Sequence, residues 1–407
     1  MPGRPVITGL GTVSALGVGA GELRAAVERG GGPRVSEVDR SAGHHLEGSA
    51  TSAAVVPLVD FKRWIPPMVA RRMSQPSRYA VIAARSALEQ AGLAIPSERD
   101  PSLAVAVSSA FGPISSSQRL MDQALDESPE AMSPFLFTEC VANAPAAHIA
   151  IQTRAAGPNH TLCQREAGGL IAVGRGASDV RSGRVGKALV GAVEEVTPLL
   201  HALLDRFGAL ARPRNGAEVA RPYDWRRNGV VMAEGATMLA LEEREDARRR
   251  GAEIQLELAG WGSAFDPTAG RAGWGNGVDA VAGRIVRSLS AWGITLEEID
   301  LVVSGASGSI AGDRLEARVL QRLWQDKTLP PVLAPKSVTG EYAGVFLGAA
   351  VIAAAGGRVG PTAGFGEADP DLGLVPHDGS PLAPPRTTLV TSFSSGGAAA
   401  WLILVQP

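Results

Sequence analysis

The sequence predicts an α/β fold that is built from two similar halves. Apolar β-prone runs alternate with helical stretches along the chain, a pattern typical of α/β architectures. The chain has 407 residues, more than one hydrophobic core usually serves. Strand-then-small-turn units also occur in the same order in both halves. This weak repeat, with a period of about 200 residues, indicates an internal duplication.

The first half begins with a strand at Val6 to Gly9, which is followed by a Gly-rich turn and a helix near Gly21 to Glu28. Residues 30–60 have weak periodicity and many Gly, Ser and charged residues, so we expect a surface excursion there. The segment Ser77 to Ala91 carries apolar residues at helical spacing, which predicts an amphipathic helix. Leu103 to Val107 is expected to be a buried strand that ends in a small-residue turn.

The repeated units each consist of a short apolar run that leads into small or polar residues. In the first half, one strand leads into SSAFG, a second into Glu166, and a third, Lys187 to Val190, into GAVEEV. In the second half, Ile299 to Val303 leads into SGASGS, Val332 to Ala334 into PKSVTGEYAG, and Thr388 to Val390 into TSFSSGG.

The joint between the halves is expected near Glu242 to Gly251. This run, EEREDARRRG, is rich in charge and is typical of a solvated helix end rather than a binding patch. We therefore divide the chain into an N-terminal half, residues 1–250, and a C-terminal half, residues 251–407.

Composition excludes several function classes. The chain is 45% hydrophobic and 20% charged, with a formal net charge of -2, as in ordinary soluble globular proteins. There is no basic surplus of the kind that indicates a nucleic-acid partner. No run approaches the roughly 18 apolar residues of a membrane span, and the N-terminus continues directly into a strand pattern without a signal peptide. We expect a cytoplasmic protein.

The cysteines and histidines do not indicate a metal or a cofactor. Cys140 and Cys163 are the 2 cysteines, and they form neither a disulfide framework nor a metal cluster. The 6 histidines are scattered without ligand spacing. We interpret Cys163 as a small buried hydrophobe rather than a reactive thiol.

An abrupt strand-to-helix elbow lies within His160 to Val173. A polar residue at such an elbow is placed beside the first N–H groups of the helix, a geometry that nucleophilic enzymes use. Here that residue is Glu166. An ionised carboxylate is also favourable at a helix N-terminus, so we interpret Glu166 as a capping residue rather than a nucleophile or base.

Four segments together give the chain a family resemblance. They are ITGLGTVSALG at the start, SRYAVIAARSALEQAGL, RPYDWRRNGVVMAEGATMLALEE at 221–243 and KSVTGEYAG at 336–344. The chain resembles the β-ketoacyl synthase family over nearly its whole length. The resemblance implies a thiolase-like αβαβα five-layer sandwich of two duplicated halves, dimerisation, and carbon-carbon bond formation on acyl carrier protein by decarboxylative Claisen condensation.

This sequence departs from the family at each catalytic position. The condensation needs a thiolate to hold the acyl chain and two imidazoles to stabilise the enolate. The resemblance places Glu166 at the position of the cysteine, Gly305 at the first histidine and Glu341 at the second. Because glycine offers neither a proton nor a donor, we expect no condensation by this chain alone.

Other pocket positions match the family. Lys336, Asp313 and Glu316 stand where the family has its lysine, aspartate and glutamate, and we expect Lys336 to pair with Glu341 and keep a buried carboxylate ionised. The glycine-rich gating loop of active synthases carries an aromatic residue, and here Ser395 takes its place.

An intact fold signature without the catalytic residues resembles the chain length factors of type II polyketide synthases. That branch usually has glutamine before AGGL, where this chain has Glu166. The resemblance implies a catalytically silent subunit of a heterodimeric β-ketoacyl-acyl carrier protein synthase. Its partners would be an active ketosynthase, acyl carrier protein and the growing polyketide chain. Two alternatives are a malonyl-acyl carrier protein decarboxylase for priming that uses Glu166, which lacks the imidazoles, and an acyltransferase that uses Cys163, which lacks a visible base.

The resemblance also predicts a tunnel gate and a partner interface. Matching VAVSSAFGPISSSQRLM to the gate motif of chain length factors places Ile114, Ser117 and Met121 at the gate positions. Spacings of three and four residues put them on one helical face. The third strand of the first half, Lys187 to Val190, and the stretch 134–148, which is too apolar to remain exposed, are expected at the partner interface.

Overall fold

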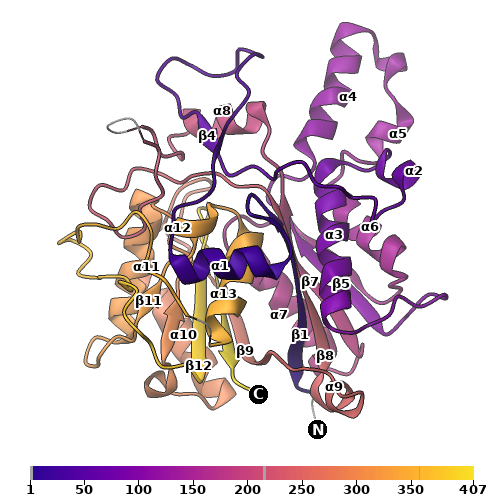
Figure 1. Cartoon of the computed structure of the whole chain (residues 1–407). Helices are drawn as coiled ribbons and strands as arrows, with labels where there is room; N and C mark the ends of the chain where they lie inside the picture. The colour runs from indigo at the N-terminus through magenta and orange to yellow at the C-terminus, as the bar shows by residue number, and fades with distance from the viewer. Residues whose placement is uncertain (1–2, 214–216, 357) are drawn as a thin grey trace.

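One large mixed β-sheet runs through the computed structural model, which describes residues 3–213, 217–356 and 358–407 (Figure 1). The strands are β1 (Pro5–Ser14), β2 (Gly17–Val18), β3 (Ser36–Glu37), β4 (Ser52–Ala53), β5 (Leu103–Ser108), β6 (Asn159–Leu162), β7 (Lys187–Glu194), β8 (Gly235–Glu243), β9 (Leu256–Phe265), β10 (Leu301–Val303), β11 (Val332–Leu333), β12 (Thr387–Phe393) and β13 (Ala398–Val405).

Helices cover both faces of this sheet. They are α1 (Ala20–Arg29), α2 (Pro67–Ala70), α3 (Gln75–Gln90), α4 (Ile114–Asp126), α5 (Pro134–Phe137), α6 (Ala144–Thr153), α7 (Gly168–Arg181), α8 (Pro198–Arg206), α9 (Arg244–Arg249), α10 (Val278–Trp292), α11 (Ile310–Leu323), α12 (Lys336–Thr339) and α13 (Ala343–Ala354), with 3-10 turns at Pro129–Ala131 and Leu296–Glu298.

The two halves of the sheet repeat one strand order. That order is β6-β5-β7-β8-β1 in the first half and β11-β10-β12-β13-β9 in the second. In each half the strands of the repeated units are parallel neighbours, since β5 pairs with β6 and β7, and β10 pairs with β11 and β12. The halves join where Val6 and Ile7 of β1 pair with Glu257 and Leu256 of β9. The predicted duplication is therefore confirmed.

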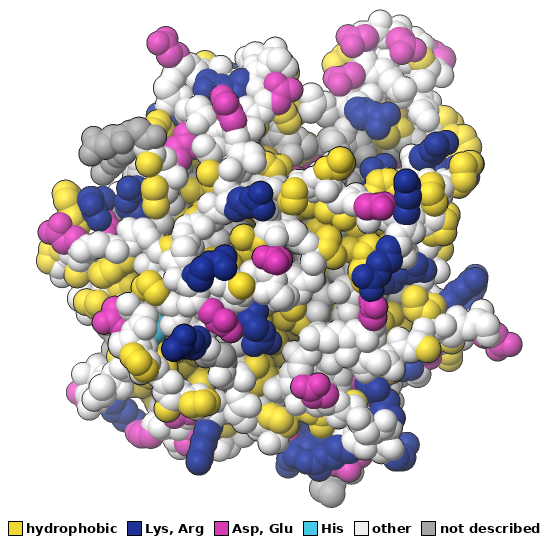
Figure 2. Space-filling view, viewed as in Figure 1, with side chains coloured by type: hydrophobic (Ala, Val, Ile, Leu, Met, Phe, Trp, Pro, Cys, Tyr) yellow, Lys and Arg dark blue, Asp and Glu magenta, His cyan; other side chains and the backbone are white. Residues whose placement is uncertain are grey.

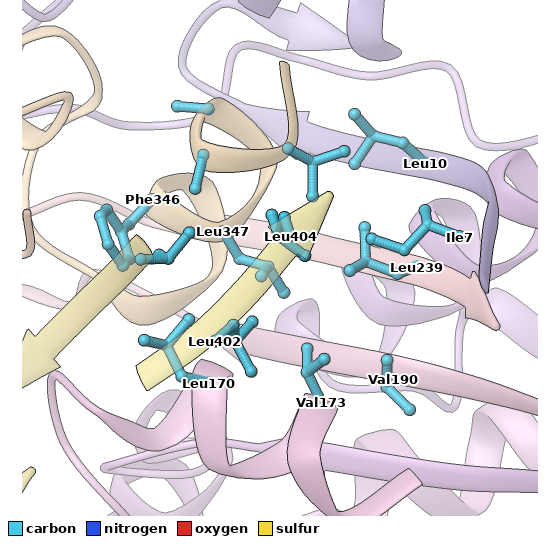
Figure 3. Packing of buried hydrophobic residues seen from close by; sticks show 14 of the residues in the cluster. Ile7, Leu10, Leu170, Val173, Val190, Leu239, Phe346, Leu347, Leu402 and Leu404 are labelled. Carbon is cyan, nitrogen blue, oxygen red and sulfur yellow. The ribbon is translucent and has the colours of Figure 1, made fainter. Parts of the chain in front are cut away.

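The helices lie in three layers, and a buried apolar cluster packs each layer against the sheet. The middle cluster packs α7 and α13 between the two halves of the sheet, where Leu170, Phe346 and Leu402 lie close together (Figure 3). A second cluster packs α3 and α6 on the outer face of the first half, and a third packs α10 and α11 on the second. Strand β10 shows the alternation, since Val303 faces the middle cluster and Val302 the outer one. The predicted αβαβα arrangement is confirmed.

The small residues of α7 allow it to lie close to the sheet. A Cβ on Gly168 would overlap the hydroxyl of Ser108 at the end of β5, and one on Gly176 would overlap the Val190 side chain of β7. Such close packing between a helix and a strand is a recurrent use of glycine. The AGGL run therefore brings the start of α7 against the ends of the parallel strands.

The predicted elements of the first half are present with longer bounds. The first strand extends to Ser14, the helix near Gly21 is α1, and the amphipathic helix is α3. The excursion at 30–60 contains only the short pair β3 and β4. The charge-rich run at the expected joint forms α9, between β8 and β9. The division near residue 250 stays a prediction.

Two expectations about the edge of the first half are wrong. Strand β7 lies between β5 and β8, so Lys187 to Val190 is not available to a partner, and β6 is the outermost strand instead. Cys163, directly after β6, is exposed rather than buried. A run of apolar residues predicts a strand but does not give its lateral position, which depends on pairing between distant segments.

Part of the apolar stretch 134–148 is exposed in the isolated chain, as expected of a surface that a partner covers, although Glu139, Ala144 and Ala146 are buried. Phe135 and Phe137 of α5 are 73% and 60% exposed, and Ile151 on the neighbouring α6 is 63% exposed. Large apolar side chains gathered in this way mark interaction sites in soluble proteins. Among the residues that the structure describes, no helix is long and apolar enough to cross a membrane.

Candidate functional site

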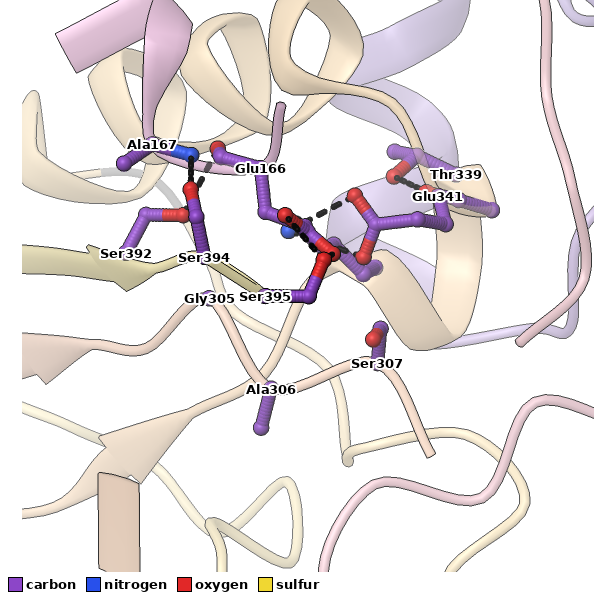
Figure 4. A network of polar contacts seen from close by, with 12 residues as sticks. Glu166, Ala167, Gly305, Ala306, Ser307, Thr339, Glu341, Ser392, Ser394 and Ser395 are labelled. Atoms are coloured by element: carbon purple, nitrogen blue, oxygen red, sulfur yellow. Dashed lines mark hydrogen bonds and ion pairs between the residues drawn. The ribbon is translucent and has the colours of Figure 1, made fainter. Parts of the chain in front are cut away.

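The loops after the parallel strands of both halves meet at one place (Figure 4). Glu166 follows β6, Gly305 follows β10, Lys336 and Glu341 follow β11, and Ser395 follows β12. The carboxyl ends of parallel strands share one edge of a sheet, which is where ligands bind in α/β folds. The structure thus brings together the positions that the sequence singled out.

Three serines at the carboxyl end of β12, Ser392 within the strand and Ser394 and Ser395 after it, hold the elbow at Glu166. The Ser392 hydroxyl donates to the Glu166 carbonyl oxygen over 2.8 Å, and the Ala167 N–H donates to Ser394 Oγ over 2.8 Å. The Ser395 hydroxyl donates to the Glu166 carboxylate, 3.1 Å from Oε1 (Figure 4). Each contact joins the first half of the chain to the second, so the elbow is fixed by the packing of the two halves.

Glu166 does not cap the helix that follows it, and the capping interpretation is wrong. The N-cap residue of α7 is Ala167, and the helix start has no hydrogen bond from a capping side chain. The Glu166 carboxylate is directed toward Ser395 instead. The residue as a whole is half-buried, but loss of water around its carboxyl group, together with the charge of Glu341, raises its pKa to about 7. The protonated and ionised forms of Glu166 are therefore both populated near neutral pH.

Lys336 and Glu341 form the predicted ion pair, which is confirmed. Lys336 is fully buried, and its Nζ donates to Glu341 Oε2 over 2.9 Å and lies 2.8 Å from Oε1. The same ammonium group lies 5.1 Å from the centre of the Phe346 ring, within the range of a cation–π contact. A buried ammonium group needs such partners to offset its lost hydration.

Gly305 leaves no room for a side chain. A Cβ at this position would lie 2.8 Å from Ser392 Oγ and 2.9 Å from Ser392 Cα. Its N–H donates to Glu316 Oε1 over 3.0 Å, and the Thr391 hydroxyl donates to the same oxygen over 2.6 Å. The loop after β10 is thus held in a position where an imidazole could be added only by moving the backbone.

Asp313 holds the same loop from α11. Its carboxylate accepts the N–H groups of Ser307 over 3.0 Å, of Gly308 over 3.1 Å and of Tyr223 over 2.9 Å. Burial raises the pKa of Asp313 to about 6. Tyr223 has a φ of 62°, a conformation that costs free energy in a bulky residue and needs such support. Asp313 therefore organises the loops around the site.

The predicted gate residues all lie in α4 but in different surroundings. Ile114 packs against a small apolar cluster that includes Leu200 and Met232. The Ser117 hydroxyl donates to the Pro113 carbonyl oxygen over 3.1 Å, and Met121 is 54% exposed. Whether they border a tunnel for the polyketide stays a prediction.

The sequence reasoning missed two groups near the site. Arg165 Nη1 donates to Ser395 Oγ over 2.8 Å, so this serine links Arg165 to Glu166. The carboxyl groups of Glu194 and Glu195, at the end of β7, and of Glu234, directly before β8, are buried. The GAVEEV turn contains two of these glutamates and could have drawn attention to them, but a sequence pattern does not indicate which residues they contact.

Nothing in the described ranges forms a metal centre, since no group of three His, Cys, Asp or Glu side chains could hold an ion there. The loops that meet at the site bring together the ionisable side chains of Glu166, Lys336 and Glu341. These groups can exchange protons and form ion pairs, but they include neither a thiol nor an imidazole.

Comparison with protein families decides the class of this fold. Residues 4–247 match the model of the β-ketoacyl synthase N-terminal domain, and residues 257–355 match that of the C-terminal domain. The chain belongs to the β-ketoacyl synthase family. The chain is also 27% identical to a Vibrio cholerae protein named 3-oxoacyl-[acyl-carrier-protein] synthase 2, over 98% of each chain.

Two solved structures of the β-ketoacyl synthase family resemble the whole chain. A chain of the ishigamide ketosynthase/chain length factor superposes with a TM-score of 0.89 at 31% identity and covers 100% of both chains. A type II polyketide synthase ketosynthase in complex with its acyl carrier protein (AntDE:AntF) gives a TM-score of 0.89 at 24% identity, again over 100% of both chains, and supports the fold alone.

Proposed function

We propose that this chain is a catalytically silent, ketosynthase-like subunit, a chain length factor. It pairs with an active ketosynthase in a type II polyketide synthase and shapes the tunnel in which the polyketide grows. The observation that carries the proposal is the Lys336–Glu341 ion pair beside Glu166. This set of charges occupies the place where condensation requires a thiolate and imidazoles.

Two further observations support this proposal. Gly305 stands where the family has its first catalytic histidine, and it packs so closely against Ser392 that an imidazole at this position would be sterically excluded. The chain is also 31% identical to a chain of the ishigamide ketosynthase/chain length factor, a protein whose name joins the two kinds of subunit in the proposed pair.

The heterodimer would form through the exposed edge of the first half. Strand β6 pairs only with β5 within the described part of the chain, so its other edge can extend a sheet into a partner. The exposed Phe135, Phe137 and Ile151 lie on the adjoining helices α5 and α6. Backbone pairing and apolar burial would then act together in one interface.

Acyl carrier protein, an acidic partner, would find a basic surface over α2, at the edge of the ketosynthase interface. Dark blue and yellow side chains lie next to each other there in Figure 2. Arg71 and Arg72 are exposed, and neither forms an ion pair with an acid of the described residues. The Arg72 guanidinium lies 5.7 Å from the centre of the Phe135 ring. Such a surface favours acidic partners by electrostatic complementarity.

Reconstitution with an intact ketosynthase and acyl carrier protein tests the proposal. The complex should produce polyketides, whereas this chain alone should neither become acylated nor decarboxylate malonyl groups. Intact-mass analysis that detects a stable acyl adduct on Cys163 or Glu166 of the isolated chain would argue against it.

Phe137→Asp should weaken the complex in the same reconstitution, since it places a charge in the apolar interface. Phe207→Asp, at the residue directly after α8, is the control and should leave assembly intact, because Phe207 is 80% exposed and Phe137 is 60% exposed. A stable, monodisperse monomer in the presence of the ketosynthase would contradict the heterodimer.

The alternative is malonyl-acyl carrier protein decarboxylase activity for chain priming. It is favoured by the raised pKa of Glu166, because a protonated carboxyl group is neutral like the amide of glutamine. Carbon dioxide release from malonyl-acyl carrier protein by the isolated chain, lost in Glu166→Ala, would support this alternative. The cytoplasmic location also stays a prediction.

A further inference from the structure

Helix α4 is weakly packed against the rest of the molecule. Of its 13 residues only Ser116 and Leu120 are buried. The helix and the neighbouring α5 stand away from the sheet at the top of the molecule (Figure 1). Few buried contacts leave a helix free to shift unless its ends are fixed.

The N-terminal end of α4 is fixed by side chains of another element. The Ser115 N–H donates to Glu195 Oε1 over 2.7 Å, and the Ser115 hydroxyl donates to Glu195 Oε2 over 2.8 Å. The preceding loop is held in the same way, since the Ala110 N–H donates to Glu194 Oε1. The N-cap residue Pro113 provides no side-chain hydrogen bond of its own. Glu195 thus acts as the missing cap from β7's carboxyl end.

Among the residues that the structure describes, no basic side chain forms an ion pair with Glu194, Glu195 or Glu234. Glu194, Glu195 and Glu234 lie close enough for their charges to interact, and burial raises the pKa of all three, that of Glu194 to about 8. Glu195 accepts the Ser115 N–H at the start of α4 and Glu194 accepts the Ala110 N–H of the preceding loop, whereas Glu234 accepts the N–H groups of Val56 and Val196 elsewhere. The second oxygen of Glu194 accepts no hydrogen bond.

The predicted gate residues depend on this attachment. Ser117 and Met121 follow Ser115 on the same helix, and α4 behaves as a rigid element over such a short length. A displacement of its first turn would move both side chains together. Ser108 Oγ, at the base of the loop, donates to the carbonyl oxygens of Leu162 and Gln164, which connects the same loop to the elbow.

We propose that Glu194 and Glu195 are positioning residues that set where α4 stands, and through it the length of polyketide that the tunnel accepts. This inference rests on the proposed function. Part of the control of product length is thereby assigned to buried residues beneath α4. These residues act through the position of the helix and not by contact with the growing polyketide.

Glu195→Ala and Glu195→Gln in the reconstituted heterodimer test this inference. The alanine variant loses both contacts to Ser115, so amide exchange across α4 should become about 5- to 30-fold faster, as expected for a loss of one to two kcal/mol. The glutamine variant keeps a carbonyl oxygen that accepts the Ser115 N–H, and its exchange should stay near that of the unmodified protein. Product lengths should broaden or shift only in Glu195→Ala.

Glu298→Ala is the matched control. The Glu298 carboxylate makes the same pair of contacts at the start of another helical turn, to the N–H of Thr295 over 2.7 Å and to its hydroxyl over 3.0 Å. It lies in the second half of the chain, so neither exchange of α4 nor product length should change.

Each result decides the inference. Unchanged exchange across α4 in Glu195→Ala would overturn it, and so would faster exchange with product lengths equal to those of Glu298→Ala. If exchange is faster but product lengths are unchanged, an active unmodified complex would still support the proposed function. An unmodified complex that forms no polyketide would overturn the proposed function and this inference together.

Discussion

Lys336 Nζ lies 2.8 and 2.9 Å from the two carboxylate oxygens of Glu341, where the loops of the two halves of the fold meet. The ammonium group is fully buried, and the carboxylate is nearly so. The pair also sets the electrostatics of Glu166, because Glu341 raises the pKa of Glu166 and Lys336 opposes that rise. Glu166, Lys336 and Glu341 thus form one electrostatically coupled group.

Removal of one partner of this pair should be strongly destabilising. Lys336→Met leaves the Glu341 carboxylate buried without a counter-charge, which costs about 3–5 kcal/mol in comparable sites. The double variant Lys336→Met/Glu341→Leu should recover most of that loss, since apolar replacements of buried pairs are often neutral. Thermal unfolding of the purified complex at fixed concentration measures both. A double variant no more stable than Lys336→Met would show that packing, not charge, dominates.

The raised pKa of Glu166 predicts a pH dependence of stability. Between the ordinary value of 4.5 and about 7, the folded protein binds more protons at Glu166 than the unfolded chain does. Stability should therefore fall as pH rises through this window, by about 1.4 kcal/mol for each unit of pKa difference at most. Other buried acids contribute in the same direction, so the informative quantity is the difference between the unmodified protein and Glu166→Gln.

Denaturant unfolding from pH 5 to pH 8 measures this difference. The unmodified protein should lose stability relative to Glu166→Gln as the pH rises, whereas the exposed Glu253→Gln should run parallel to the unmodified protein. A constant difference between the unmodified protein and Glu166→Gln across this range would contradict a raised pKa.

Gly305 should tolerate no added atom. Gly305→Ala would bring a Cβ to within 3.0 Å of three Ser392 atoms, and such overpacking typically costs about 1–3 kcal/mol. Gly270→Ala is the matched control, because a Cβ there meets nothing within 4 Å. Differential scanning calorimetry should show a lower melting temperature for Gly305→Ala only. By the same reasoning, Gly305→His together with Glu166→Cys should not restore condensation, and product formation by that variant would disprove this account.

Much of the fold could be predicted because its signals are local and repeated. Apolar runs such as Leu103 to Val107 predicted strands, and the small residues after each run predicted the turns at the site. Motif spacing placed Glu166, Gly305 and Glu341 in one family site, and the structure brings their loops together.

Contacts between distant segments were out of reach. Ser392 and Glu166 are 226 positions apart, and nothing in the composition of either segment indicates their hydrogen bond. The same applies to Glu195 and Ser115, which are 80 positions apart. The order of strands in the sheet, which puts β6 rather than β7 at the edge, is also a property of distant pairing. Helix capping by Glu166 was expected from charge alone, but side-chain direction decided otherwise.

The gate helix gives the prediction with the most direct functional readout. Ser117 and Met121 lie on one side of α4, four residues apart, so a bulky residue at either position adds volume on the same face. Ser117→Phe and Met121→Phe should shorten the polyketides released by the reconstituted complex without dissociating it. Ile114→Phe also enlarges this face, but the Ile114 side chain packs against Leu200 and Met232, so this substitution should cost stability as well.

Arg119→Phe is the control, because Arg119 is exposed and lies on the opposite side of the helix from Ser117. Mass spectrometry of the released chains measures the length distribution, and sizing of the complex verifies assembly. If Ser117→Phe and Met121→Phe give the same distribution as Arg119→Phe, this face of α4 does not border the growing chain; if they dissociate the heterodimer, the face packs against the partner instead.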